Sequence, residues 1–222
     1  MCGRYSLEFD EDFYKRYRLA NKLPAKPNYN VTPSQLMPVV VAHSPNRMEF
    51  MLWGLIPFWE EKNEKPRYLA NIRDDSIINK RWADKYVQFQ RCLVPATSYF
   101  EWKKTSDGKV PFLFKLTGRK YFAFAGVYSI YKNPKNRAEV KTYSIITTTP
   151  NKIGGEVHNR MPVILKEEDE QKWLNPDMVE IDHIKEFLKS YPDSEMMKYV
   201  VSTKVNNPSN NIYKIIKELK GD

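Results

Sequence analysis

The chain has 222 residues, of which 41% are hydrophobic and 14% aromatic, enough to bury the core of one compact domain. No apolar run reaches the roughly 18 residues of a membrane span, and the N-terminus lacks the regions of a signal peptide. We therefore expect a cytoplasmic protein, or a nuclear one in a eukaryote. The net charge of +9 favours a polyanionic partner, although many basic proteins bind no nucleic acid.

Strand patterns dominate the chain, with helical patterns near both ends. The first part predicts a helix at 7–19, an extended proline-containing stretch at 22–35, strands at 36–42 and 48–55 with a turn at 43–47, and a helix at 78–89. The middle predicts strands at 91–96, 98–104, 110–116, 120–131 and 141–149. The last part predicts helices at 166–174 and 182–190, a strand at 199–203 and a helix at about 209–220. We predict a single α+β domain over 1–222, built around a mainly antiparallel, curled or barrel-like sheet with peripheral helices.

Cys2 is the most distinctive position, because it directly follows the initiator Met1. Removal of Met1 would leave an α-amine and a thiol on adjacent carbons, with pKa values of about 7.7–8.0 and about 8.5. The amine condenses with an aldehyde to an imine, and the thiol then closes a five-membered thiazolidine ring. While Met1 stays attached, that nitrogen is an amide and the ring cannot form. Taken alone, Cys2 fits better with a chain terminus of no chemical role.

Three further segments carry candidate chemistry. Asn71 and Arg73 follow a loop, where an amide can bind a ring oxygen or an amine and a guanidinium can fork to a phosphate. Glu101 lies between Phe100 and Trp102, where desolvation would raise the pKa of its carboxyl. His158 sits in a polar loop before a strand, as an acid/base would. Each segment alone also fits an ordinary helix entry, strand end or loop.

Other features narrow the chemistry. Trp59 precedes a charged loop, so its ring is a candidate for an exposed side chain that stacks on an unpaired base. Trp53 instead fits a core position. Cys92 lies in an apolar strand pattern and is interpreted as a buried, inert thiol. No spacing of Cys and His matches a metal site, and no glycine-rich phosphate loop is present. We therefore expect no metal and no cofactor.

The ordered set of motifs resembles the SRAP family, the SOS-response-associated peptidases, also described as abasic-site processing proteins. The matching segments are MCGRYS at 1–6, YNVTP at 29–33, WGLIPFW at 53–59, ANIRDDS at 70–76, RCLVPATSYFEW at 91–102, VHNRMPVIL at 157–165 and VSTKVNN at 201–207. They cover residues 2–207 of the mature chain, and together they are far more specific than any one of them.

The resemblance implies covalent capture of abasic sites in single-stranded DNA, through a thiazolidine crosslink that shields the lesion in the DNA damage and SOS response. It implies that Cys2 forms the crosslink, that Asn71 positions the amine and sugar, and that Glu101 and His158 handle protons. The remaining matches are phosphate contacts by Arg4, Arg73 and Arg160, and a wedge or stacking role for Pro33 and Trp59. It also implies possible crosslink reversal, strand cleavage as a lyase, and self-removal of Met1.

The implied partner is single-stranded DNA that contains abasic sites. We expect the protein to act as a monomer, without a membrane partner, and to be associated with the nucleoid if it is bacterial. Two departures from the family pattern stand out, namely Asp74 and Asp75 after Arg73, and Ser98–Tyr99 before the FEW segment. The residues by themselves also allow two other functions. One is a cysteine peptidase or amidase with Cys2 as nucleophile, and the other is a non-catalytic single-strand binder.

Overall fold

Five strands of the described chain hydrogen-bond in a closed ring, in the order β10–β4–β3–β6–β9 and back to β10. The structure, a computed structural model, describes residues 2–43 and 46–219. The ring strands are β3 (Leu36–Val41), β4 (Arg47–Trp53), β6 (Arg91–Ala96), β9 (Phe122–Lys132) and β10 (Glu139–Thr148). All neighbours are antiparallel except β10 and β4, which run parallel. This confirms the predicted fold class of an α+β domain around a mainly antiparallel, barrel-like sheet.

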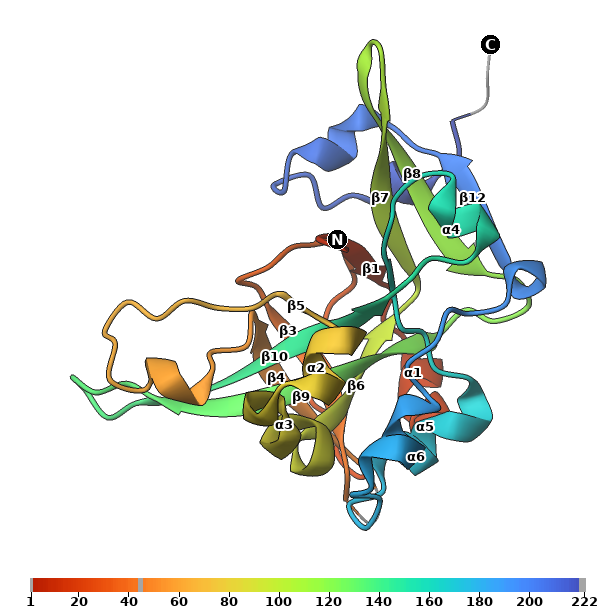
Figure 1. Cartoon of the computed structure of the whole chain (residues 1–222). Helices are drawn as coiled ribbons and strands as arrows, with labels where there is room; N and C mark the ends of the chain where they lie inside the picture. The colour runs from red at the N-terminus through yellow and green to blue at the C-terminus, as the bar shows by residue number, and fades with distance from the viewer. Residues whose placement is uncertain (1, 44–45, 220–222) are drawn as a thin grey trace.

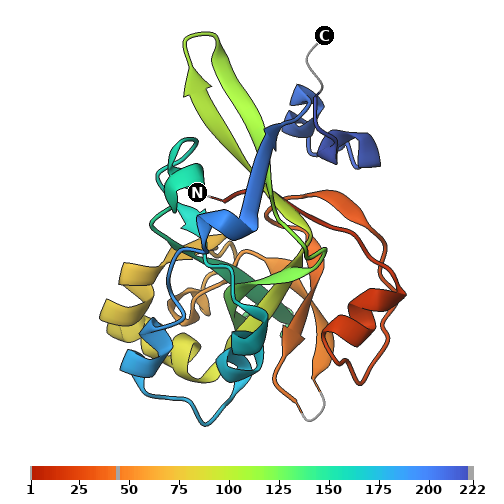
Figure 2. The same ribbon diagram turned by 90° about the vertical axis from the view of Figure 1, so that its right-hand side faces the viewer.

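A second sheet stands on top of the barrel (Figure 1). Its order is β12–β8–β7–β1–β2, from strands β1 (Tyr5–Leu7), β2 (Asn28–Val31), β7 (Ser98–Thr105), β8 (Gly108–Leu116) and β12 (Met196–Val200). The hairpin of β7 and β8 projects away from the barrel, and the N-terminus lies near its base (Figure 2). Its outer part is supported by a separate small core of Phe100, Leu113, Val201, Val205 and Ile215.

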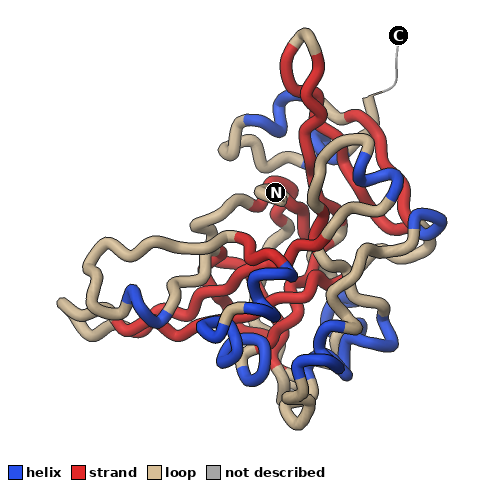
Figure 3. The backbone as a smooth tube through the Cα atoms, viewed as in Figure 1, coloured by secondary structure: helices blue, strands red, loops and turns tan. Residues whose placement is uncertain are grey.

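Short helices cover the lower part of the barrel, while strands form its centre (Figure 3). They are α1 (Glu11–Arg16), α2 (Asp74–Asn79), α3 (Asp84–Phe89), α5 (Glu167–Leu174) and α6 (Ile181–Lys185). The remaining helix α4 (Lys152–Gly155) lies higher, beside β12 of the second sheet (Figure 1). Single 3-10 turns are η1 (Phe58–Glu60), η2 (Arg81–Ala83), η3 (Asp193–Glu195), η4 (Thr203–Asn206) and η5 (Tyr213–Ile216). Two short strands, β5 (Asn71–Arg73) and β11 (Met161–Pro162), extend the edges of β10. None of the helices in the described ranges is long and apolar enough to cross a membrane.

Several predicted helices are shorter than expected. The helix predicted at 7–19 is confined to α1, because Tyr5–Leu7 pair in a sheet, Asp10 caps the first turn and Arg18 takes a left-handed φ of 50°. The helix predicted at 78–89 is broken by the extended backbone of Lys80. Instead of a helix at about 209–220, the described chain has only η5. Met1, residues 44–45 of the predicted turn and residues 220–222 lie outside the described residues.

Candidate active site

The C-terminal half of β10 gathers segments that are far apart in the chain. β5 runs parallel to it, so that Asn71 pairs with Ile145 and Arg73 with Thr147. On the other edge of β10, β11 pairs with Thr147 and Thr148. The loop before β11 carries His158 and Arg160, so β10 brings the two predicted motifs to opposite sides of one strand end.

The antiparallel strands β1 and β7 bring Cys2 and Glu101 to the same place. The amide of Phe100 donates to the carbonyl of Arg4 at 2.9 Å, and the Cys2 thiol lies 3.7 Å from that same oxygen. The thiol is therefore next to the residue that precedes Glu101. Asn71 Nδ2 donates to the Cys2 carbonyl at 2.8 Å, which joins the start of the chain to the edge of β10.

Burial shifts the pKa of each ionisable group in this cluster toward its neutral form. Cys2 is fully buried, and burial together with the negative charge of Glu101 raises the pKa of the thiol. Burial raises the pKa of the Glu101 carboxyl to about 7. Burial also lowers the pKa of His158, with a smaller contribution from the ammonium of Lys104. At neutral pH the thiol and imidazole are mainly neutral and the carboxyl is close to half ionised, which suits proton transfer in either direction.

The imidazole of His158 is oriented by the backbone that follows it. The amide of Arg160 donates to Nδ1 of His158 at 3.1 Å, a shorter separation than the 3.3 Å between Nδ1 and the Arg160 carbonyl. This contact favours the tautomer that carries its proton on Nε2. The ring is thus held by main-chain groups of the loop that enters β11.

A cleft of about 440 Å³ opens beside these groups. It is lined by Arg4, Glu101, Trp102, Lys104, Lys109, His158 and Asn206. Three predicted residues therefore line one cleft, and Cys2 and Asn71 adjoin it through the contacts just described. Elsewhere in the described chain, as here, no three His, Cys, Asp or Glu side chains gather closely enough to hold a metal ion.

Four of the lining residues were missed by the sequence analysis. Trp102 donates from Nε1 to Asn206 Oδ1 at 2.7 Å, and the Arg4 guanidinium lies 5.7 Å from the centre of its ring. Lys104 and Lys109 face each other directly across the β7–β8 hairpin. Like charges in such a pair repel, and a bound anion would relieve that repulsion. The register of the hairpin could have paired the two lysines, but nothing in the sequence brings Asn206 to this wall.

Two of the three predicted phosphate-binding arginines are paired with the two acidic residues that depart from the family pattern. Arg73 is exposed and forms a two-pronged ion pair with Asp75. Arg160 donates to Asp74 at 2.7 Å and to the Thr147 carbonyl, and its side chain is only 11% exposed. Arg73 can exchange its partner for a phosphate at little cost, whereas Arg160 is fixed in the wall between β10 and the β11 loop.

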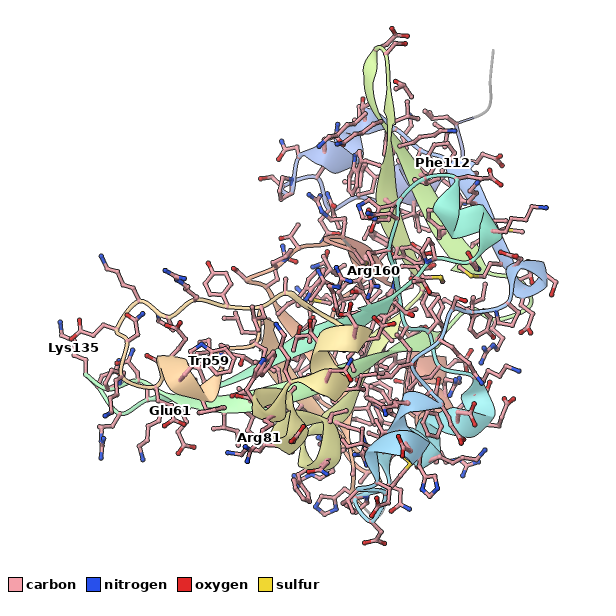
Figure 4. All side chains as sticks on the ribbon, in the orientation of Figure 1. Trp59, Glu61, Arg81, Phe112, Lys135 and Arg160 are labelled. Atoms are coloured by element: carbon pink, nitrogen blue, oxygen red, sulfur yellow. The ribbon has the colours of Figure 1, made fainter. Side chains whose placement is uncertain are left out.

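Pro33 and Trp59 lie outside the residues that line the cleft. Pro33 is half-buried in the turn after β2, beside Ser34 with its left-handed φ of 72°. Trp59 is 48% exposed on η1, where it packs edge-on against Trp82 with ring centres 5.0 Å apart. Figure 4 shows Trp59 well away from Arg160. The structure therefore does not bring Trp59 to the cluster around Cys2, although the ring remains open to solvent.

The barrel, the topping sheet and the cleft at the N-terminus define the class to which this chain belongs. The family model described as SOS response associated peptidase (SRAP) matches residues 1–208. The chain is therefore a member of the SRAP family, as its motifs predicted.

Individual relatives support this assignment. The chain is 39% identical over 224 residues to the abasic site processing protein YoqW of Bacillus subtilis, covering 97% of this chain and 99% of the relative. It is 29% identical to the abasic site processing protein HMCES of Xenopus tropicalis, over 84% of this chain and 64% of that longer relative. A crystal structure of a Bacteroides thetaiotaomicron protein superposes with a TM-score of 0.89 at 27% identity, covering 99% of this chain and all of the other.

Proposed function

We propose that this protein processes abasic sites in single-stranded DNA by capturing them covalently through the aminothiol of Cys2. The observation that carries the proposal is that Cys2 and Asn71 adjoin one cleft that Glu101 and His158 line, together with three basic side chains, Arg4, Lys104 and Lys109. The family relatives named as abasic site processing proteins support the same substrate.

The chemistry needs Met1 to be removed, so that the Cys2 nitrogen is an amine. The ring-opened sugar presents an aldehyde carbon, which the amine attacks to give an imine with loss of one water. The thiol then adds to the imine carbon, its proton ends on the nitrogen, and a thiazolidine closes. The second step is intramolecular and gains from proximity, because both nucleophiles belong to one residue.

The surrounding groups suit the proton transfers of these steps. Neutral His158 can accept the proton of the sugar hydroxyl as the ring opens. Glu101, with a pKa of about 7, can accept the thiol proton when sulfur attacks and return it to nitrogen. Within the described residues, the buried Oδ1 of Asn71 has no hydrogen-bond partner, so it can accept from the Cys2 amine.

The charge of the cleft suits a phosphodiester strand. Among the residues that the structure describes, Arg4, Lys104 and Lys109 line it together with one carboxyl, that of Glu101. Each phosphate that a cation contacts releases counterions and contributes to affinity. We include the exposed Arg73 in the phosphate contacts and keep Pro33 and Trp59 as candidates to guide the flanking bases. Arg160 contributes as the support of Asp74 and of the His158 loop.

Intact-mass measurement tests the proposal directly. The purified protein is expected to lack Met1 and, after incubation with a single-stranded abasic oligonucleotide, to gain the oligonucleotide mass less one water. A tetrahydrofuran analogue, which has no aldehyde, and the undamaged strand serve as controls and should give no adduct.

Two outcomes would overturn the proposal. Absence of an adduct with turnover of a peptide substrate would instead support a cysteine peptidase or amidase. Equal affinity for abasic and undamaged strands, unaffected by Cys2→Ser, would support a non-covalent binder.

A further inference from the structure

Asn30, in β2, is fully buried and uses its whole side-chain amide in one network beside the cleft. Its Nδ2 lies 3.3, 3.0 and 2.9 Å from the carbonyl oxygens of Val205, Asn207 and Asn210. Its Oδ1 accepts from Arg4 Nη1 at 2.6 Å. With nitrogen and oxygen exchanged, the oxygen would face three carbonyls, so the network assigns the amide orientation.

Arg4 is held by this network on one side only. Its Nη1 donates to Asn30 and also to the Val205 carbonyl at 2.6 Å, while the guanidinium lies over the Trp102 ring. Arg4 also lines the cleft, so the two bonds of Nη1 fix the orientation of a guanidinium that borders it. A planar guanidinium with one edge fixed presents its other N–H groups in a set direction, as recognition of a phosphate requires.

The same amide holds the wall of the cleft that adjoins Arg4. Residues 203–211 contain only the 3-10 turn η4 and little further regular structure. Asn206, from this segment, lines the cleft and accepts from Trp102 at 2.7 Å. The segment is also tied by the Tyr29 amide, which donates to Asn211 Oδ1 at 2.7 Å. The backbone hydrogen bonds of these residues are local and span two or three positions, so the carbonyl contacts of Asn30 are what tie Val205, Asn207 and Asn210 to β2.

We propose that Asn30 is a positioning residue for lesion capture, which acts by fixing both the Arg4 guanidinium and the 203–211 wall of the cleft. It contacts neither the sugar nor the reacting atoms. Its effect passes through Arg4, both directly and through the Val205 carbonyl of this wall, which also accepts from Arg4. The inference rests on the proposed function, since the ligand that Arg4 addresses is a phosphate of the captured strand.

A double-mutant cycle of Asn30→Ala and Arg4→Ala tests this inference. The rate of adduct formation at low abasic oligonucleotide concentration should fall by about tenfold in each single variant, as for loss of a hydrogen bond to a charged group. The double variant should be no slower than Arg4→Ala alone, because the two residues act as one unit. The rate at saturating oligonucleotide should fall less, since strand binding rather than ring closure is weakened.

Asn46→Ala is the matched control. Asn46 is also a buried asparagine, but it donates to the Tyr17 carbonyl at 3.2 Å and lines no part of the cleft. It should lower the melting temperature and leave the capture rate unchanged. If Asn30→Ala does not fold, Asn30→Ser, which keeps a hydroxyl, replaces it in the cycle.

Three results would contradict the inference or separate it from the proposed function. The inference would be overturned if the capture rate is unchanged in the Asn30 variant. It would also be overturned if the decreases in capture rate of the two single variants multiply in the double variant. If the wild-type protein forms no adduct, the proposed function fails instead. In that case the affinity of each variant for an undamaged single-stranded oligonucleotide is measured instead. If the losses of affinity in the two single variants multiply in the double variant, the role of Asn30 is again contradicted.

Discussion

The barrel and the cleft bury arginines in opposite ways. Arg91, at the start of β6, is 5% exposed and donates from all three nitrogens to main-chain carbonyls of α3 and of the end of α5. Arg4 and Arg160, in and beside the cleft, each keep a buried Nε that has no hydrogen-bond partner among the described residues. Such a group costs stability, and it is tolerated where a ligand or a reaction step can use it.

An unpartnered atom alone does not mark a site. Gln90 and Ser144, at the barrel, also carry buried polar atoms without a partner in the described chain. At the cleft, however, the same feature occurs at Arg4, Asn71 and Arg160 within one group of connected residues. The difference is that unpartnered polar atoms are scattered in the barrel but adjoin one another at the cleft, which is what the proposed chemistry there would require.

The two cysteines give the sharpest form of this comparison. Both are fully buried, and burial raises the pKa of both thiols. Only Cys2 adjoins Glu101 and can acquire a free amine. Cys2→Ala should therefore abolish the heat-stable adduct, while Cys92→Ala should leave its yield within about twofold, since a barrel thiol without a base takes no part. Gel analysis of heated samples measures both, and an adduct that survives in Cys2→Ala would contradict the mechanism.

Glu101→Gln should have the next largest effect on capture. Loss of a general acid/base slows such steps by about 10²–10⁴-fold, while binding of the undamaged strand should be kept. In the wild type, the rate limited by thiol deprotonation should rise with pH through about 7 as the carboxyl ionises. Single-turnover rates between pH 5.5 and 8.5 check this, and a variant that retains the step near pH 7 would exclude Glu101 as the base.

The same substitution should stabilise the fold at alkaline pH. The pKa of Glu101 rises from an ordinary 4.5 to about 7 in the folded state, so the unfolded chain binds fewer protons in this range. Stability from this group is therefore fully present below about pH 4 and is lost as pH rises through 7. Glu101→Gln should raise the free energy of unfolding at pH 8 by on the order of 3 kcal/mol, and much less at pH 4. Urea unfolding at both pH values measures the difference, and equal shifts would contradict the assignment.

The facing lysines should show a smaller, salt-dependent effect. Lys104→Ala and Lys109→Ala should each flatten the dependence of log affinity on log salt by up to about one unit. Thermal stability should be unchanged or slightly higher, because a like-charge pair is removed. Lys135→Ala is the control, since Figure 4 shows Lys135 at a remote tip. If the slope of log affinity against log salt is the same for all three variants, the β7–β8 hairpin does not contact the DNA strand.

A barrel substitution should have the smallest effect on capture. Leu93 is fully buried in β6, and Leu93→Ala should lower the free energy of unfolding by about 2–5 kcal/mol. The capture rate of the folded variant should stay within about twofold of wild type. Thermal unfolding measures the loss of stability, and single-turnover kinetics at 25 °C measure the capture rate. A large decrease in the capture rate would show that the barrel and the cleft are coupled.

The sequence by itself determined the positions of most strands, the family and the candidate residues for the chemistry. The aminothiol of Cys2 and the motifs around Asn71, Glu101 and His158 are local patterns, so they can be recognised before any fold is known. Most strands were predicted to within a few residues, because alternation and apolar runs are local signals as well.

Only the tertiary structure decided how these pieces meet. The closure of the barrel through parallel β10 and β4, the pairing of β5 with β10, and the hold of Asn30 on residues 205–210 join positions far apart in the chain. The segment at 209–219 has helical spacing, yet it forms only η5, because Tyr213 packs on Tyr29 and the Leu219 amide donates to Val200. Long-range pairing of this kind overrides local propensity, and it brings Cys2, at the start of the chain, next to the cleft.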